Sequence, residues 1–566
     1  MYKILSLLNE KQKKIAFIIG ALILALSAFE LLIFSLIQPI ILFFTLSDGA
    51  KKIKYIGNNF ITDISVTQVL IFFLIVFIIR SILTVFVSYL RQKLIKDIND
   101  TLSNKIYSNY LNKDFLFFIN SNSSTFLSRI ILEIEKFAYR LIDSLFYLLT
   151  DFAIVLVVIF YLFYTHFLPA AIFFLISFIF FGFFYTKYKR IYKELGEKKI
   201  FYDQEKIKGL QDSFYIIQSI KLENLENIFI NKFKISTQKS SYSTFFYNFI
   251  NDLPKNLVEM AMLIIFVLII CLLLYYFNLP KDEILSILGL FTFGMFRLLP
   301  STNRVLHAIN TIRFYRASTD ILKKELEDLN DIKKNQEIGE NIFIFKDSIK
   351  LQNISFSYDN KIDILKNVNL EIKKNKTIGI KGDSGVGKST LLNIICYLLH
   401  PSEGEVMVDE KRISKIYKAY QKKIGYVPQK IYLIDDSIIS NITLGAINAE
   451  LDYNLFKEVI KNSNLEDFLH KLENKENTFI GERGAKLSGG QQQKLGIARA
   501  LYKRPEIIIF DEATNALDQN SENEILDTIK ILKKENTIII VSHKDSTLRY
   551  CDEIFELKNK QIFKLS

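Results

Sequence analysis

Six long apolar runs dominate the first 303 residues of the chain and constrain its fold more than any other feature. They lie near residues 15–46, 67–90, 141–164, 167–186, 257–277 and 284–303. About 20 apolar residues are long enough for a helix to cross the roughly 30 Å hydrocarbon core of a bilayer. Because lipid offers no partner for backbone N–H and C=O groups, such runs fold as helices. The sequence therefore predicts a bundle of six transmembrane helices.

The connections between these runs predict which side of the membrane each one faces. An even number of spans puts both termini on one side. The two long connections, about 91–140 and about 187–256, are rich in charged residues at helical spacing. Basic loops stay on the cytoplasmic side, so we expect cytoplasmic termini and an outward loop at 47–66. These loops also account for the net charge of +12, and we expect no nucleic-acid partner.

The chain changes character after the last apolar run. A helical, amphipathic pattern continues to about residue 333, and we expect a linker at 321–347. From residue 348 onward, β-rich runs such as TIGIKG, EIIIFDE and TIIIVSH alternate with helical segments. This alternation is typical of an α/β domain with a largely parallel sheet. The predicted fold class is a six-helix transmembrane domain, 1–320, fused to an α/β P-loop nucleotide-binding domain, 348–566.

A phosphate-binding loop follows the apolar strand TIGIKG directly. The segment GDSGVGKS, 382–389, has the pattern G-x-x-x-x-G-K-[ST], and the apolar helix TLLNIICYLL comes next. Backbone amides of such a loop close around phosphates, and the helix N-terminus adds positive charge. We expect Lys388 to contact the phosphates and the Ser389 hydroxyl to bind Mg²⁺. The residues predicted to bind nucleotide here are Gly382, Ser384, Gly385, Gly387, Lys388, Ser389 and Thr390.

Two adjacent acids end the apolar strand EIIIFDE. Asp511 is predicted to hold Mg²⁺ through water, as a carboxylate at the tip of a strand beside a phosphate loop does. Glu512 is predicted to act as the general base on the attacking water. With the phosphate loop, these acids predict a Mg²⁺-dependent nucleotide hydrolysis site.

A second anion-binding helix start lies in LSGGQQQKLGIARAL, 487–501. Ser488, Gly489 and Gly490 place a small hydroxyl and two bare backbones where the helix begins, which suits an anion. This segment, with the phosphate loop before it and Asp511–Glu512 after it, resembles the nucleotide-binding domain of ATP-binding-cassette (ABC) transporters.

The resemblance implies roles for further residues. Tyr358 is similar to the aromatic that stacks on adenine, and Gln429 to the loop glutamine that senses Mg²⁺ and contacts the membrane domain. GERG at 481–484 resembles the exporter segment before the signature, NALD at 515–518 the D-loop, and His543 the switch histidine near the γ-phosphate. The resemblance thus adds Ser488, Gly489, Gly490, Gln491, Asp518 and Tyr358 to the ATP-binding residues, Gln429 to the metal ligands, and Gln429 and His543 to the catalytic residues.

Three positions depart from the usual family pattern. Asn515 stands where Ser is usual, Lys494 where Arg is common, and Lys544 where Arg is frequent. None is a position expected to hold phosphate or to act as base. The resemblance therefore implies active ATP hydrolysis with Mg²⁺.

The same resemblance implies an assembly and a place in the cell. In this family ATP binds between the phosphate loop of one chain and the signature of another, and this chain has one intact copy of each. A homodimer with two working sites is the simplest expectation, and a heterodimer stays open. Spans fused ahead of the nucleotide-binding domain resemble a half-transporter of the exporter type, in a bacterial inner membrane. Segments 113–126 and 220–229 are expected to transmit closure of the nucleotide-binding domains.

Basic residues in the apolar runs point to the cargo. A cation inside a span costs about 2.5–3.5 kcal/mol on insertion scales and is a functional candidate. Arg297 and Arg304 are seven residues apart, roughly two helical turns, so they share a face. We expect Glu30 and Glu259 to be too few to neutralise all the cations, which either pair with acids and headgroups or line a cavity that receives an anion. The four candidate substrate residues are Arg80, Lys255, Arg297 and Arg304.

A finer resemblance covers residues 289–322. This stretch resembles the corresponding region of the flippase for lipid-linked oligosaccharides in bacterial protein N-glycosylation, whose Y/F-R-L-x-P-S-x-N-R block is matched by Phe296 to Arg304. Arg80 and Lys255 fall where that flippase has basic residues, although lysine lacks the bidentate fork of arginine. The resemblance implies a polyprenyl-pyrophosphate-linked glycan as cargo. The alternatives are another amphipathic cargo, such as a lipid A precursor or a peptide, a non-transporting ATPase, and a regulatory protein or channel gated by ATP.

Overall fold

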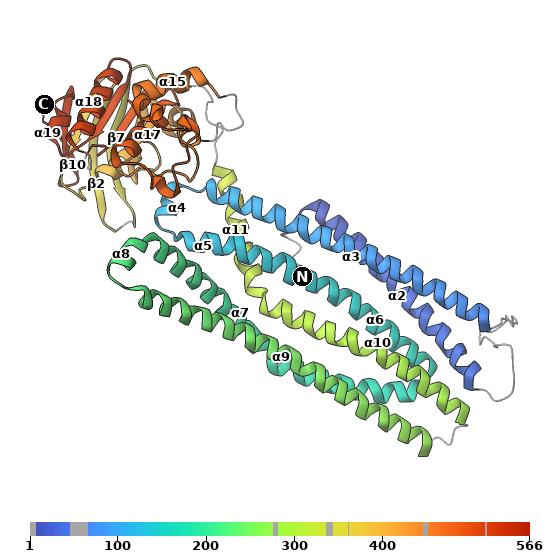
Figure 1. The fold of residues 1–566 in the computed structure, drawn as a ribbon. Coiled ribbons are helices and arrows are strands. Elements are labelled where there is room, and N and C mark those ends of the chain that lie inside the picture. The colour runs from blue at the N-terminus through green and yellow to red at the C-terminus, as the bar shows by residue number, and fades with distance from the viewer. Residues whose placement is uncertain are drawn as a thin grey trace. The chain divides into compact units, whose positions relative to one another are not determined.

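The computed structural model describes residues 7–45, 66–275, 281–335, 343–359, 361–444, 451–514 and 518–565. They form two compact units (Figure 1). Unit 1 comprises Met1–Lys113 and Ser121–Lys333, and unit 2 comprises Asp114–Asn120 and Lys334–Ser566. Unit 1 is helical and unit 2 is α/β, so the predicted fold class is confirmed.

Unit 1 is a bundle of long helices that run alongside one another (Figure 1). The pairs α2–α3, α6–α10 and α7–α9 are in extensive contact. His166, with φ −142°, interrupts the helix between α6 and α7, and Pro169 lies in the first turn of α7, where its missing N–H is tolerated. The elements are α2 Glu10–Thr45, α3 Val66–Leu111, α5 Ser123–Leu127, η1 Ser128–Glu133, η2 Lys136–Ile142, α6 Asp143–Thr165, α7 Phe167–Tyr215, α8 Ile217–Leu222, α9 Glu226–Tyr275, α10 Lys281–Phe314 and α11 Arg316–Asn335.

Three helical stretches among the described residues are long and apolar enough to cross a membrane: Glu10–Ile37, Thr67–Leu111 and Ser123–Thr165. They contain most of the first predicted span and all of the second and third. The fourth and sixth predicted spans fall within α7 and α10, and the fifth falls within α9 except for its last two residues, which lie outside the described residues. Residues 47–65 of the predicted outward loop also lie outside the described residues. The number six therefore stays a prediction.

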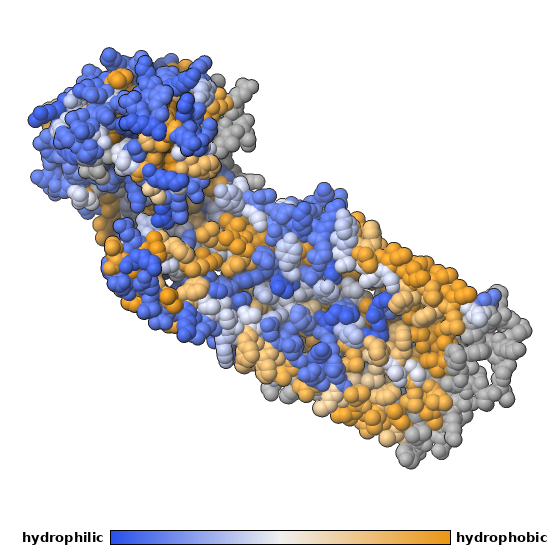
Figure 2. Space-filling view, in the orientation of Figure 1, coloured by the Kyte–Doolittle hydropathy of each residue, from blue (hydrophilic) through white to orange (hydrophobic). Residues whose placement is uncertain are grey.

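The surface of α3 explains why this bundle belongs in lipid. Its large apolar side chains point away from the protein, and Figure 2 shows hydrophobic residues gathered over this side of unit 1. Soluble proteins rarely expose apolar patches of this extent. The exposed residues of α3 include Ile71, Phe72, Leu74, Ile75, Phe77, Ile78, Ile79, Ile82, Val85 and Phe86.

The described residues of unit 2 form two sheets. One is four-stranded with the order β2-β1-β4-β5, and the other is six-stranded with the order β10-β9-β3-β8-β7-β6. In the second sheet, β6, β7, β8, β3 and β9 run parallel to one another and β10 is antiparallel to β9, so the sheet is largely parallel, as predicted. The strands are β1 Ser348–Ser357, β2 Asp363–Lys373, β3 Thr377–Lys381, β4 Glu403–Val408, β5 Lys411–Arg412, β6 Ile424–Val427, β7 Ile507–Asp511, β8 Thr537–Val541, β9 Glu553–Lys558 and β10 Gln561–Lys564.

Alternate residues of the central strands enter different apolar cores. Ile507 and Ile509 belong to one buried cluster, whereas Ile508 and Phe510 belong to another. Successive side chains of a strand point to opposite faces, and a parallel sheet is covered on both. The helical elements of this unit are α4 Phe115–Ile119, α12 Lys388–Ile395, η3 Ile413–Lys415, α13 Tyr417–Gln421, α14 Ile438–Thr443, α15 Tyr453–Asn462, α16 Glu466–His470, η5 Lys475–Asn477, η6 Glu482–Gly484, α17 Gly489–Leu501, α18 Gln519–Leu532 and α19 Asp545–Leu548.

The short helix α4 belongs to unit 2, although it lies in the chain between two helices of unit 1. Its Leu116 packs against the buried cluster that contains Ile507 and Ile509. The predicted transmitting segment 113–126 therefore includes a helix that contacts the nucleotide-binding domain. The other predicted segment, 220–229, spans the end of α8 and the start of α9 within unit 1.

Candidate functional site

The phosphate loop joins the end of β3 to the start of α12. Gly387 precedes the helix with φ +109°, and Gly385 has φ +79°, a left-handed conformation that favours glycine. A Cβ at Gly387 would also lie 2.9 Å from Ile364 Cγ2. The glycine spacing of the motif is therefore required by the path of the backbone.

Lys388 lies at the centre of this loop. Its side chain is 6% exposed, and its amine donates hydrogen bonds to the carbonyl oxygens of Gly382, at 2.8 Å, and Asp383, at 3.0 Å. The same amine is 2.8 Å from His543 Nε2. A buried charge needs such partners, and phosphate oxygens could replace them when nucleotide binds.

Glu512 brings the three predicted catalytic residues together. Gln429 Nε2 donates to its Oε2 at 2.8 Å, and His543 Nε2 is 3.1 Å from its Oε1. Lys388 Nζ is 3.5 Å from the same Oε1. Glu512 itself has φ +51°, a strained conformation of the kind that clusters at functional sites. The Glu512 carboxylate follows β7 and is contacted by His543, which follows β8, and by Gln429 in the loop after β6.

Asp511, the last residue of β7, is buried beside the predicted magnesium ligand Ser389. Tyr426 donates a hydrogen bond to Asp511 Oδ2 at 2.9 Å. Burial raises the pKa of Asp511, while hydrogen bonds from Tyr426 and Ser389 oppose this shift. Sequence reasoning missed Tyr426, because its contact with Asp511 depends on β6 pairing with β7.

The donor set fits Mg²⁺ bound with a nucleotide rather than a metal held by protein alone. Among the described residues, no group of three or more His, Cys, Asp or Glu side chains could hold an ion. Magnesium keeps several waters and uses one or two protein oxygens plus phosphates. The Ser389 hydroxyl and the Asp511 carboxylate supply such oxygens.

Replacing Asp511 with Asn is expected to stabilise the nucleotide-free protein at neutral pH. Because burial raises the pKa of Asp511 above 3.8, its contribution to folding is greatest below about pH 4 and is lost as the pH rises through the folded pKa. The gain in melting temperature should therefore be present near pH 7 and shrink toward pH 4. Differential scanning fluorimetry across this range checks it, and an equal gain at both pH values would contradict the prediction.

Tyr358 follows β1, and the signature segment lies at the start of α17. The Tyr358 hydroxyl is 3.0 Å from Thr390 Oγ1 on α12, beside the phosphate loop. Ser488 caps α17, where its Oγ accepts from Gln491 N and Gln491 Oε1 accepts from Ser488 N. Gly489 has open space where a Cβ would be. Within the described part of the chain, no hydrogen bond or ion pair joins the signature to the phosphate loop.

The other family segments are partly described. GERG, 481–484, includes the short turn η6, and Gln492 Nε2 donates to Gly484 O at 3.1 Å. Asp518 caps α18 by accepting from Ser521 N at 3.3 Å, and this bonding lowers the pKa of Asp518. The preceding D-loop residues 515–517, with Asn515, lie outside the described residues.

The two described departures from the family pattern have local partners. Lys494 forms an ion pair with Glu524, at 2.5 Å. Lys544 forms one with Glu522 and donates to Thr514 O at 2.9 Å. These partners of the two lysines lie in other segments of the same domain, and none of them belongs to the phosphate loop.

The structure pairs three of the four candidate substrate cations with acids. Arg80 of α3 and Arg297 of α10 both contact the carboxylate of Glu30 on α2. Arg304 forms a bidentate pair with Asp151, with Nε–Oδ2 at 2.8 Å and Nη2–Oδ1 at 2.7 Å. Lys255 is exposed on α9. Both acids are only 3% exposed.

The expectation that Glu30 and Glu259 are the available acids was wrong. Asp151 lies in the third apolar run, in the segment LLTDFAIV, and neutralises Arg304. Sequence reasoning missed this acid. Arg80 and Arg297 share a single carboxylate, so this pair retains one excess positive charge. The expected basic site is therefore reduced to Arg80 and Arg297. Lys255 is not part of this cluster.

Known proteins match both parts of the chain. Residues 16–298 match the family model "ABC transporter transmembrane region", and residues 365–515 match "ABC transporter". The chain is 39% identical over 218 residues to a putative export ATP-binding/permease protein of Rickettsia typhi, covering 38% of each chain. It is 38% identical over 231 residues to a putative multidrug export ATP-binding/permease protein of Staphylococcus aureus, covering 40% of each.

These matches span about two fifths of the length of the curated relatives. A solved structure, a bacterial Atm1-family ABC exporter with ATP bound, is similar over nearly the whole chain. Its TM-score is 0.77 at 20% identity, with 98% of this chain and 95% of that chain covered. That likeness shows the fold.

Proposed function

The chain belongs to the ABC transporters that carry their own transmembrane region, and from this we propose that it couples ATP hydrolysis to export of a cargo across the membrane. The observation that carries this proposal is the convergence of Gln429, His543 and Lys388 on the carboxylate of Glu512. A general base needs hydrogen-bonded neighbours that fix its position. The same site contains a phosphate loop with its lysine buried.

In the proposed mechanism Glu512 takes a proton from the attacking water. His543 and Gln429 orient its carboxylate, and Lys388 exchanges the carbonyls of Gly382 and Asp383 for phosphate oxygens. Mg²⁺, held by Ser389 and Asp511, would neutralise charge on the phosphates. The remaining contacts to ATP are proposed for the loop glycines, Ser384, Thr390 and Tyr358.

The working assembly is proposed to be a homodimer. Ser488 and Gly489 begin α17 with open space beside Gly489, which leaves room for the nucleotide of a second chain. One chain supplies one phosphate loop and one signature, so two identical chains complete two sites. We place Gln491, Gly490 and Asp518 in the same interface, in a bacterial inner membrane with cytoplasmic termini. The domain limits proposed are 1–320, 321–347 and 348–566.

The cargo proposed is an anionic lipid-linked oligosaccharide with a polyprenyl-pyrophosphate anchor. Its support is the positive excess where Arg80 and Arg297 share Glu30, together with the sequence block from Phe296 to Arg304. A cation held inside a bundle marks a substrate pathway. Arginine suits phosphate because its planar fork donates two parallel hydrogen bonds.

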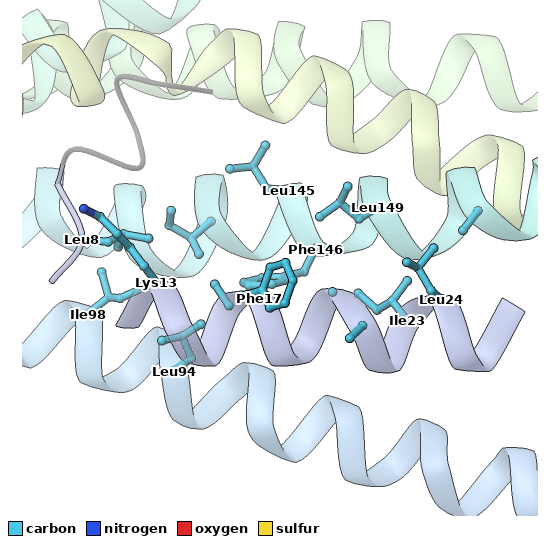
Figure 3. Close-up of a pocket in the computed structure, with 15 residues that line it drawn as sticks. Leu8, Lys13, Phe17, Ile23, Leu24, Leu94, Ile98, Leu145, Phe146 and Leu149 are labelled. Atoms are coloured by element: carbon cyan, nitrogen blue, oxygen red, sulfur yellow. The ribbon is translucent and has the colours of Figure 1, made fainter. Parts of the chain in front are cut away.

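Export of another amphipathic cargo is the second candidate. The staphylococcal relative is described as a putative multidrug exporter. Unit 1 also has an apolar pocket of about 510 Å³ between α2, α3 and α6. Figure 3 shows Lys13 at one end of this pocket and Leu24 at the other, with Phe17 and Phe146 between them. An apolar chain with an anionic end would fit this arrangement, whether or not it carries a glycan.

A flipping assay tests the cargo. Proteoliposomes would contain a fluorescent undecaprenyl-pyrophosphate oligosaccharide, and its ATP-dependent flipping would be compared between wild type and Arg297→Gln. We expect flipping per ATP hydrolysed to fall at least tenfold, because Arg80 then becomes neutralised by Glu30 and the positive excess is lost. Arg190→Gln is the matched control, since Arg190 is 91% exposed on α7.

Two results would overturn this cargo. If the wild-type protein hydrolyses ATP without flipping the lipid-linked glycan, this glycan is excluded as the cargo, and ATP-driven export of another cargo is the remaining function. If Arg297→Gln flips the glycan normally, the positive excess at Arg80, Arg297 and Glu30 has no role in transport. The Arg304→Ala variant used alongside would separate the two arginines, because Arg304 is already paired with Asp151.

A further inference from the structure

Unit 1 contains a polar cavity whose lining, apart from Arg304, has no role in the function proposed above. It has a volume of about 580 Å³ and lies between the start of α6 with η2, the middle of α9 and the end of α10. Pockets of this size hold drug-sized ligands. Its wall is rich in tyrosines and charged groups: Tyr139, Arg140, Tyr147, Arg304, His307 and Tyr315 are among them.

Most charged groups of this wall already have partners. Arg304 is paired with Asp151, and Asp143 is paired with Arg91, at 3.2 Å. Arg91 also donates to the Tyr147 hydroxyl at 3.1 Å. Arg140 is exposed to the cavity and forms no ion pair with any described residue. Among the described residues of the wall, Arg140 is therefore a cation without a direct ion pair, although the Asp143 carboxylate is near enough to interact with its charge.

The segment that supplies Tyr139 and Arg140 has an unusual backbone. Residues Lys136–Ile142 form the π-helix η2, which is separated by two residues from another π-helix, η1, Ser128–Glu133. Such turns are rare and are frequent at functional sites. Lys136 fixes this segment through ion pairs with Glu133, at 2.8 Å, and Asp203, at 2.9 Å. The wall of the cavity is thus held in place before any ligand arrives.

We propose that this cavity binds the phosphorylated glycan headgroup of the cargo at a position separate from the cluster of Arg80, Arg297 and Glu30, with Arg140 on the phosphate and the tyrosines on the sugar. The inference rests on the proposed export of a lipid-linked glycan. A tyrosine offers a flat apolar ring and a hydroxyl, the two contacts that a sugar ring and its hydroxyl rim require. Arginine can donate two hydrogen bonds to one phosphate. The polyprenyl tail needs no place here.

The absence of tryptophan from the sequence makes binding directly measurable. Tyr139→Trp in the full-length protein places a single tryptophan in the wall, in liposomes of zwitterionic lipid without any other protein. The probes are undecaprenyl-pyrophosphate glycan, the soluble sugar pyrophosphate, inorganic pyrophosphate and undecaprenol. We expect saturable changes with the first two, a weaker one with inorganic pyrophosphate, and none with undecaprenol. Tyr107→Trp on α3, outside the cavity, is the control reporter, and Tyr315→Trp replaces Tyr139→Trp if that variant does not fold.

The role of Arg140 is tested in the same reporter protein. Arg140→Gln should raise the Kd of the soluble sugar pyrophosphate about tenfold or more, as expected for loss of a charge-assisted hydrogen bond. Arg140→Lys should lose less affinity, and Arg190→Gln none. Unchanged affinity in Arg140→Gln, or equal binding of undecaprenol, would overturn the proposal.

The outcome separates this inference from the proposed function. If wild-type protein flips the lipid-linked glycan but neither Tyr139→Trp nor Tyr315→Trp responds to the sugar pyrophosphate, the proposed binding site in the cavity is wrong and the proposed cargo is retained. If the reporters bind the sugar pyrophosphate through Arg140 but no flipping occurs, the cargo proposal fails and the cavity remains a binding site for phosphorylated sugars.

Discussion

Glu512→Gln is expected to lower ATP turnover by about 10²–10⁴-fold, the contribution of a positioned general base, while ATP still binds. The amide of the new glutamine can accept the hydrogen bond that Gln429 now donates to Oε2, so the site keeps its geometry. It cannot accept the proton of the attacking water. Steady-state ATPase activity and nucleotide binding of the same preparation measure the two effects separately.

The blocked variant should also accumulate as an ATP-bound dimer, because each proposed ATP site is completed by the signature of a second chain and the ATP between the two chains is not hydrolysed. Size-exclusion chromatography with Mg²⁺-ATP would show this species. Glu458→Gln is the matched control, since Glu458 is an exposed acid on α15 of the same unit. Normal turnover in Glu512→Gln would remove Glu512 from the role of base, and loss of nucleotide binding would assign it to the fold of the loop.

The nucleotide site could be predicted largely from sequence because its residues stand at the ends of local elements. Lys388 begins α12, Asp511 ends β7, and His543 follows β8 after one residue. Each position is marked by an apolar strand next to a polar or glycine-rich turn. Tyr426 could not be predicted in this way, because its bond to Asp511 requires the pairing of β6 with β7.

The membrane charges were harder to predict because their partners lie on helices far apart in the chain. Arg297 and Glu30 are 267 residues apart, and Arg304 and Asp151 are 153 apart. Sequence spacing places Arg297 and Arg304 on one face of α10, but it does not say which helix that face meets. The two arginines accordingly have different acids.

The cavity beside Arg140 had no sequence signal at all. Residues 91–140 have the charged helical pattern of a solvated extension, and the π-helical turns at Ser128–Glu133 and Lys136–Ile142 leave no mark in the pattern of apolar residues. Their position follows from buried ion pairs with α7, such as Lys136 with Asp203. As for the membrane arginines, ion pairs between residues far apart in the chain determine which charged side chains are left to bind a ligand.

Glu30→Gln is expected to destabilise the protein by about 3–5 kcal/mol, the cost of leaving buried charges without a partner. The carboxylate of Glu30 is 3% exposed and joins α2 to Arg80 on α3 and Arg297 on α10. Removing it leaves two guanidiniums close together with no counter-ion. Arg297→Gln should cost far less, because Arg80 and Glu30 then form a neutral pair.

The order of stabilities makes this prediction specific. We expect wild type to be the most stable, followed by Arg297→Gln, then the double variant Glu30→Gln/Arg297→Gln, and finally Glu30→Gln. The double variant is the more stable of the last two because it leaves only Arg80 unpaired, so a second mutation partly rescues the first. Denaturant unfolding in detergent measures the series, with Glu259→Gln on α9 as the control acid. If Glu30→Gln unfolds like wild type, the shared pair contributes nothing to the bundle, and both arginines would be free to serve the cargo alone.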